Sequence, residues 1–223
     1  MKKLFFILCM LPLLLNSCMS SKQSSLTKET RYGKLYEEQP ISILIMPPIN
    51  KTNNVAAKEY MYTTLYQPLC NLGYYVYPPY MTLDILQRES AYDSEMFLEG
   101  DLSKFREYIG ADIVLFTVIH NWKKGMSSIN TQIEYRLVST HSNEVLYSHV
   151  GDLTLDFSSG NNSGLFGLLA EVISTATTPV VEVARNSNAY ILRDMPRGKY
   201  SENYMKDKEW SAEPLNISAT IKK

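Results

Sequence analysis

Two runs of β-branched and aliphatic residues constrain the fold of this 223-residue chain more than any other feature. Residues 41–46 read ISILIM and end at a Pro-Pro pair, and residues 113–119 read IVLFTVI. Strands that are buried on both faces have such continuous apolar sequences, and they occur in parallel sheets covered by helices on each side. Both runs are therefore predicted to be central strands of an α/β sheet.

The residues between these runs predict a β-α-β unit. Residues 55–72 carry apolar and aromatic side chains at helical spacing, with an asparagine pair as N-cap candidates and Gly73 to end the helix. Residues 74–77 (YYVY) then form a short strand, which a right-handed crossover would place parallel to the first. Two short helices are expected over 81–88 and 102–109.

Two later segments predict an antiparallel hairpin. Apolar and polar residues alternate with period two over 129–137 and 145–157, which indicates strands with one packed and one solvated face. A turn at 141–143 (HSN) joins them, and a helix over 165–185 with a kink at Pro179 follows. The predicted fold class is α/β: a mixed sheet with a parallel β-α-β core and an antiparallel hairpin, with helices packed on the sheet.

The N-terminus is typical of an exported precursor. Two lysines precede an apolar stretch, 4–15, that is too short to span a bilayer of roughly 30 Å, which indicates a signal peptide. The following Leu15-Asn16-Ser17-Cys18 resembles the lipobox of bacterial lipoproteins, although Asn16 is unusual at its position. This resemblance implies cleavage before Cys18 and transfer of diacylglycerol to the Cys18 thiol. Because Met19 replaces the Asp of an inner-membrane retention signal, and 20–23 lack an acidic run, we expect the periplasmic face of the outer membrane.

Composition predicts four segments. Residues 1–17 form the signal peptide, 18–39 a lipidated N-terminus and flexible tether, 40–205 a single α/β domain, and 206–223 a polar C-terminal tail. The tether is predicted because residues 19–39 are mostly Ser, Lys, Gln, Thr and Glu. The chain turns polar and irregular after residue 186, and its last dozen residues are expected to be poorly ordered.

The sequence offers no recognisable chemistry. A net charge of -1 provides no broad positive field for nucleic acid. His120, His141 and His149 lack metal-ligand spacing, and 158–164 (SSGNNSG) lacks the Lys-Ser/Thr ending of a phosphate loop, so we read it as a flexible loop. Once Cys18 is lipidated, Cys70 has no intrachain disulfide partner, and we expect a buried, inert thiol. We therefore predict no enzyme, no catalytic residue, no cofactor and no metal.

Tyrosine is unusually frequent, with 16 residues against 7 Phe and 2 Trp, and several lie between positions 60 and 80. Tyrosine combines an apolar ring with a polar tip and is enriched at binding hot spots. The predicted partner surface consists of Tyr62, Tyr66, Tyr74, Tyr77 and Tyr80. The alternative is that these rings simply cover the sheet.

Three segments carry a family resemblance: 46–50 (MPPIN), 72–78 (LGYYVYP) and 110–115 (GADIVL). They resemble the lipoproteins of domain-of-unknown-function 799, known from a genome-derived Neisseria antigen, and the resemblance covers roughly 38–205. It implies an architecture similar to the TolB N-terminal domain and the CsgG periplasmic domain. It also implies an accessory role in export or envelope assembly beside a CsgG-like partner. The Lys-rich tail and the Tyr-rich first helix depart from the family pattern.

The predicted function is a non-catalytic envelope adaptor that binds the membrane through its lipid and another envelope protein through its surface. Two alternatives stay open: a small-ligand binder or hydrolase with an unrecognised site, and one subunit of an oligomeric pore that uses the alternating hairpin. A deep cleft with converging polar groups would favour the ligand binder, and a flat aromatic patch would favour the adaptor.

Overall fold

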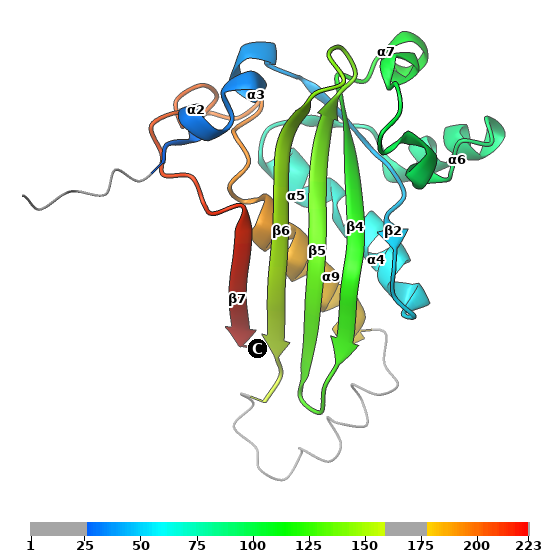
Figure 1. Cartoon of the computed structure of the whole chain (residues 1–223), viewed down its shortest axis with the longest axis vertical. Helices are drawn as coiled ribbons and strands as arrows, with labels where there is room; N and C mark the ends of the chain where they lie inside the picture. The colour runs from blue at the N-terminus through cyan, green and yellow to red at the C-terminus, as the bar shows by residue number, and fades with distance from the viewer. Residues whose placement is uncertain (1–25, 159–177, 223) are drawn as a thin grey trace, which may run out of the picture.

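The structure, a computed structural model, describes residues 26–158 and 178–222, and it is built around one mixed sheet (Figure 1). The strand order is β3-β1-β4-β5-β6-β7, and β2 also pairs with β4. The strands are β1 (Ser42–Ile45), β2 (Ile49–Asn50), β3 (Tyr75–Val76), β4 (Ile113–Lys124), β5 (Ser128–Ser139), β6 (Val145–Asp156) and β7 (Asn216–Lys222).

Helices lie on both faces of this sheet. They are α2 (Lys28–Arg31), α3 (Gly33–Glu38), α4 (Val55–Thr64), α5 (Tyr66–Asn71), α6 (Pro79–Arg88), the 3₁₀ helix η2 (Ser94–Phe97), α7 (Ser103–Ile109) and α9 (Thr178–Leu192). Residues of α4, α5 and α9 pack on one face in the larger core, and Figure 1 shows α9 running behind β5 and β6. Residues of α6 and α7 cover the opposite face of β1 and β4 in a smaller core.

The predicted parallel β-α-β unit is confirmed. Strand β1 pairs in parallel with both β3 and β4, and every residue of β1 is buried. The helix predicted over 55–72 is instead two helices, because α4 ends at Thr64 and α5 begins at Tyr66. Pro68 lies in α5 and lacks the N–H that would continue the hydrogen-bond ladder back to Thr64.

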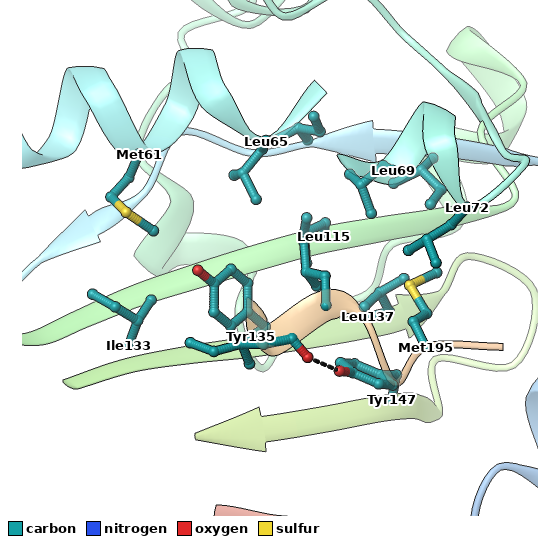
Figure 2. Packing of buried hydrophobic residues seen from close by; sticks show 14 of the residues in the cluster. Met61, Leu65, Leu69, Leu72, Leu115, Ile133, Tyr135, Leu137, Tyr147 and Met195 are labelled. Carbon is teal, nitrogen blue, oxygen red and sulfur yellow. Dashed lines mark hydrogen bonds between the residues drawn. The ribbon is translucent and has the colours of Figure 1, made fainter. Parts of the chain in front are cut away.

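The predicted hairpin is confirmed as β5 and β6, which pair antiparallel over most of their length. Their inward-facing residues share the larger core with α4 and α5, where Met61 lies over Ile133 and Leu69 over Leu137 (Figure 2). Both strands are therefore packed into their own domain along their apolar face.

The predicted flexible tether is wrong for residues 28–38. They form α2 and α3, and Tyr32, Leu35 and Tyr36 are almost fully buried in the larger core. These three side chains recur at helical spacing, but polar neighbours on each side give the segment the composition of a linker. The rigid domain therefore begins at least ten residues earlier than predicted.

The predicted polar, poorly ordered C-terminus is wrong as well. Helix α9 continues past residue 186 to Leu192, and residues 216–222 form β7, which pairs in parallel with β6. Only Ile217 of this strand is buried, and most of its other residues are polar, which is why its composition resembles that of a tail. Residues 159–177, which contain most of the predicted loop and the start of the predicted helix, lie outside the described residues. Within the described part, no helix is long and apolar enough to cross a membrane.

Candidate functional site

The five tyrosines predicted as a partner surface do not share one exposed surface. Tyr62 and Tyr74 are only 7% and 4% exposed. Their hydroxyls donate to the carbonyls of Pro79 and Pro196 at 2.8 and 2.9 Å, and burial raises the pKa of both groups. The prediction is therefore wrong for these two residues, whose rings belong to the core.

The other tyrosines gather at the β3 end of the sheet. Tyr66 and Tyr80 are 39% and 85% exposed, and Tyr77 is half-buried with its hydroxyl donating to the Ile109 carbonyl at 2.9 Å. Tyr75, which the sequence prediction missed, is 48% exposed, and its ring meets that of Tyr77 edge-on at 5.3 Å. The exposure of Tyr75 follows from the alternation of side chains along an extended segment, in which Tyr74 points inward and Tyr75 points outward.

We call Tyr66, Tyr75, Tyr77 and Tyr80 the tyrosine edge. Among the described strands, β3 pairs only with β1, so this two-residue strand lies at the edge of the sheet. Cys70 lies in the same region, half-buried rather than fully buried, and its hydrogen bond with Tyr66 raises the pKa of that tyrosine. The tyrosine edge thus places exposed aromatic rings beside the last strand of the sheet.

A second candidate is the face of β4–β7 opposite α9, which is bare in front of β5, β6 and β7 in Figure 1. It holds an open hollow of about 490 Å³. The polar residues that line it are Asn121, Asn130, Thr131, Asp152, Thr154, Ser218 and Thr220.

Polar side chains on this face are already paired with one another. Gln132 donates to Asp152 at 2.8 Å, and Thr154 donates to Asn130 at 2.6 Å. Further along, Glu134 accepts from Arg136 at 2.6 Å and contacts the His120 ring at 2.7 Å. Burial acts to raise the pKa of Glu134, but the hydrogen bonds from His120 and Arg136 outweigh it and lower the pKa. The face therefore presents polar groups that can form hydrogen bonds with a polar ligand or protein.

A third group of polar residues was not predicted from the sequence. Lys28, Tyr32, His149, Asp194 and Asp207 are each at most 3% exposed, and we call them the ionic clasp. The Lys28 Nζ lies 3.9 Å from Asp194 and 3.8 Å from Asp207. The Tyr32 hydroxyl donates to Asp194 and lies 2.5 Å from the His149 Nε2.

Burial has the largest effect on the charges of the ionic clasp. It lowers the pKa of Lys28, although attraction to Asp194 and Asp207 acts to raise it. It raises the pKa of Asp194, although the Tyr32 hydrogen bond and the Lys28 charge act to lower it. Because these groups are shielded from solvent, a substrate cannot contact them. The clasp instead joins the N-terminal helices to β6 and to the segment after α9. Lys28 and Tyr32 lie more than a hundred residues before His149, Asp194 and Asp207, so no local pattern could have revealed the group.

The ionic clasp predicts a pH dependence of stability. Burial lowers the pKa of His149 to about 4, whereas histidine in an unfolded chain titrates near 6.5. The unfolded state therefore binds this proton first, and the free energy of unfolding should fall by about 1.4 kcal/mol per pH unit as pH drops from about 6.5 towards 4.

Urea unfolding of the wild type and of His149→Gln at several pH values would measure this contribution. The variant keeps a donor for Tyr32 but has no titratable ring, so its unfolding free energy should change less over this pH range. The raised pKa of Asp194 acts in the opposite direction, and it is present in both proteins. Parallel pH profiles would contradict the assignment to His149.

The remaining candidate residues do not form a site. His120 lies on the open face, His141 in the β5–β6 turn and His149 in the clasp. Across residues 26–158 and 178–222, no group of three or more His, Cys, Asp or Glu side chains is placed to hold a metal ion. Cys18, the predicted lipidation site, lies outside the described residues.

Comparisons with known proteins point to one family. The family model described as "Putative lipoprotein GNA1162-like" matches residues 30–197. The Neisseria meningitidis serogroup B protein named "Putative lipoprotein NMB1124/NMB1162" is 25% identical over 146 residues, which cover 64% of this chain and 67% of that protein.

Solved structures give weaker likenesses. Lipoprotein GNA1162 from Neisseria meningitidis is 23% identical with a TM-score of 0.49, covering 63% of this chain and 99% of its own. The PelC dodecamer from Paraburkholderia phytofirmans is 14% identical with a TM-score of 0.36, covering 66% and 87%.

The family-model match extends over most of the chain and includes both central strands of the sheet. It confirms the predicted resemblance to a Neisseria lipoprotein, whereas the family number and the likeness to TolB and CsgG stay predictions. Lipoproteins are held at membranes of the cell envelope by their lipid. This chain belongs to the GNA1162-like lipoprotein family of lipid-anchored envelope proteins.

Proposed function

We propose that this chain is an outer-membrane lipoprotein, anchored through Cys18 on the periplasmic face, that acts as a non-catalytic adaptor in envelope assembly or export. Its partner is another envelope protein, which binds the tyrosine edge. The signal peptide, the lipobox-like Leu15-Asn16-Ser17-Cys18 and the Met19 that follows support the anchor and the membrane. A CsgG-like protein is the partner class that the sequence resemblance implies.

The observation that carries the adaptor proposal is the exposure of Tyr66, Tyr75 and Tyr80 beside the edge strand β3. Tyrosines lose little conformational entropy when they bind, and they are enriched at hot spots of protein interfaces. Tyr66, Tyr75 and Tyr80 are exposed in this one region, as a protein-binding surface requires.

The hollow on the open sheet face supports a second candidate, a binder of small polar ligands. Its volume is within the range of ligand sites, but it is shallow and lined by polar groups rather than by the apolar walls that enclose most ligands. Its lining residues Asp152 and Asn130 already accept hydrogen bonds from Gln132 and Thr154. The pore alternative loses support because β5 and β6 bury their apolar face under their own helices.

Site-specific photocrosslinking in native membranes tests the adaptor proposal. A photoreactive residue at Tyr75 or Tyr80 should crosslink to one envelope protein, and the mass of that protein would identify a CsgG-like partner. The same residue at Met126, which is 88% exposed in the β4–β5 turn, should give no such product. Cys18→Ala should abolish the crosslink by releasing the protein from the membrane. Equal labelling from Met126 and Tyr75 would contradict the proposal.

A further inference from the structure

The chain enters the folded domain at a fixed point, Leu26. Its carbonyl accepts from the Ala212 N–H at 2.7 Å, and the Lys28 N–H donates to the Trp210 carbonyl at 2.8 Å. Thr27 forms an antiparallel bridge with Ser211 between these two bonds. Lys28 then lies near Asp194 and Asp207 in the ionic clasp, so detaching the N-terminal segment would expose these buried charges.

This entry point limits the distance between the domain and a lipid on Cys18. Eight residue steps separate Cys18 from Leu26 in the sequence. A fully extended chain spans at most about 3.6 Å per residue, so Leu26 stays within about 29 Å of the lipidated residue. The 18–39 tether predicted from composition would have allowed more than twice this distance. The surface around Leu26 is therefore the part of the domain that the anchor holds nearest the bilayer.

That surface exposes apolar side chains. Leu26, Trp210 and Leu215 are 43%, 42% and 52% exposed, whereas the other tryptophan, Trp122, is 8% exposed in the core. Tryptophan concentrates at membrane interfaces because its ring is apolar and its N–H is polar. The Trp210 ring also lies beside cations, with the Lys28 Nζ at 5.5 Å and the Arg197 Cζ at 5.8 Å from its centroid.

Charge contributes little to this surface. Lys208 pairs with Glu29 at 2.9 Å, and Arg193 pairs with Glu213 at 2.8 Å, so neighbouring charges largely cancel. These two pairs reduce the attraction to anionic headgroups. Burial of the apolar side chains is therefore the contribution to docking that we expect to dominate.

We propose that the surface of Leu26, Trp210 and Leu215 docks on the bilayer that carries the lipid anchor, with the Trp210 ring in the headgroup region. This inference rests on the proposed lipidation of Cys18.

Tryptophan fluorescence tests the docking directly. The full chain with Trp122→Phe retains Trp210 as its single tryptophan, and the lipidated form would be placed in phosphatidylethanolamine/phosphatidylglycerol vesicles. Trp210 emission should shift to the blue relative to the unlipidated Cys18→Ala form in buffer. Lipids brominated near the headgroup end of the acyl chains should quench it, and quenching should persist at high salt.

A matched control places the tryptophan elsewhere on the same anchored protein. Met126→Trp, combined with Trp122→Phe and Trp210→Tyr, reports on the β4–β5 turn and should be quenched several-fold less. Intact mass and co-sedimentation with vesicles report the anchor separately. A protein that carries lipid and co-sediments, but whose Trp210 is quenched no more than the Met126→Trp control, overturns the docking alone. Absence of lipid on Cys18 in protein from native membranes overturns the proposed anchor and the docking together.

Discussion

Replacing Lys28 with alanine is expected to lower the free energy of unfolding by about 3–5 kcal/mol, the usual cost of removing one partner from a buried ion pair. The Lys28 ammonium lies within 4 Å of both Asp194 and Asp207, and all three residues are at most 3% exposed. Without it, the Asp194 and Asp207 carboxylates remain in a desolvated site and lose this countercharge. Urea denaturation followed by circular dichroism would measure the loss.

Lys34 provides the matched control. It also lies in the N-terminal helical segment and pairs with Glu144, but both side chains are about half exposed. Solvent screens such a pair, so Lys34→Ala should cost at most about 1 kcal/mol. Equal destabilisation by the two substitutions would show that the ionic clasp has no special role. A loss confined to Lys28→Ala would establish that the segment before β1 is part of the folded domain.

Replacing Gly73 with alanine is expected to lower the free energy of unfolding by about 2–5 kcal/mol, because two separate costs add. Gly73 has a φ of +92°, a conformation that side chains other than glycine rarely adopt. An added Cβ would also lie 2.7 Å from the Cβ and 2.9 Å from the Cα of Ser201. The Tyr200 N–H donates to the Gly73 carbonyl at 2.9 Å, so this backbone cannot move away freely.

Gly33→Ala is the control for this substitution. Gly33 begins α3, has no atom within 4 Å of the position where a Cβ would stand, and has no positive φ. Alanine there should be neutral or should stabilise the protein by up to about 1 kcal/mol, because it restricts the unfolded chain. Thermal and urea unfolding of both variants would test the contrast. A Gly73→Ala protein as stable as Gly33→Ala would contradict the close packing of residues 198–201 on the α5–β3 turn.

Local sequence determined those elements whose own residues show which of their faces are buried. The continuous apolar runs at 41–46 and 113–119 predicted β1 and β4, since a strand with no polar face must be covered on both sides. Alternating apolar and polar residues predicted β5 and β6, since a strand with one packed and one solvated face alternates in this way. The proposed lipidation of Cys18 also depends only on contiguous residues.

Tertiary structure alone decided which tyrosines are exposed and where the domain ends. Tyr62 and Tyr66 both lie in the segment predicted as one helix, yet one is buried and the other exposed, because Leu65 interrupts the helix and α5 follows as a separate element. Lys28 and β7 belong to segments with linker-like composition. Lys28 is stabilised in the interior by carboxylates contributed from positions 194 and 207, and β7 by hydrogen bonds to β6. These partners are remote in the chain, so the physical reason for burial lies in contacts that no local pattern contains.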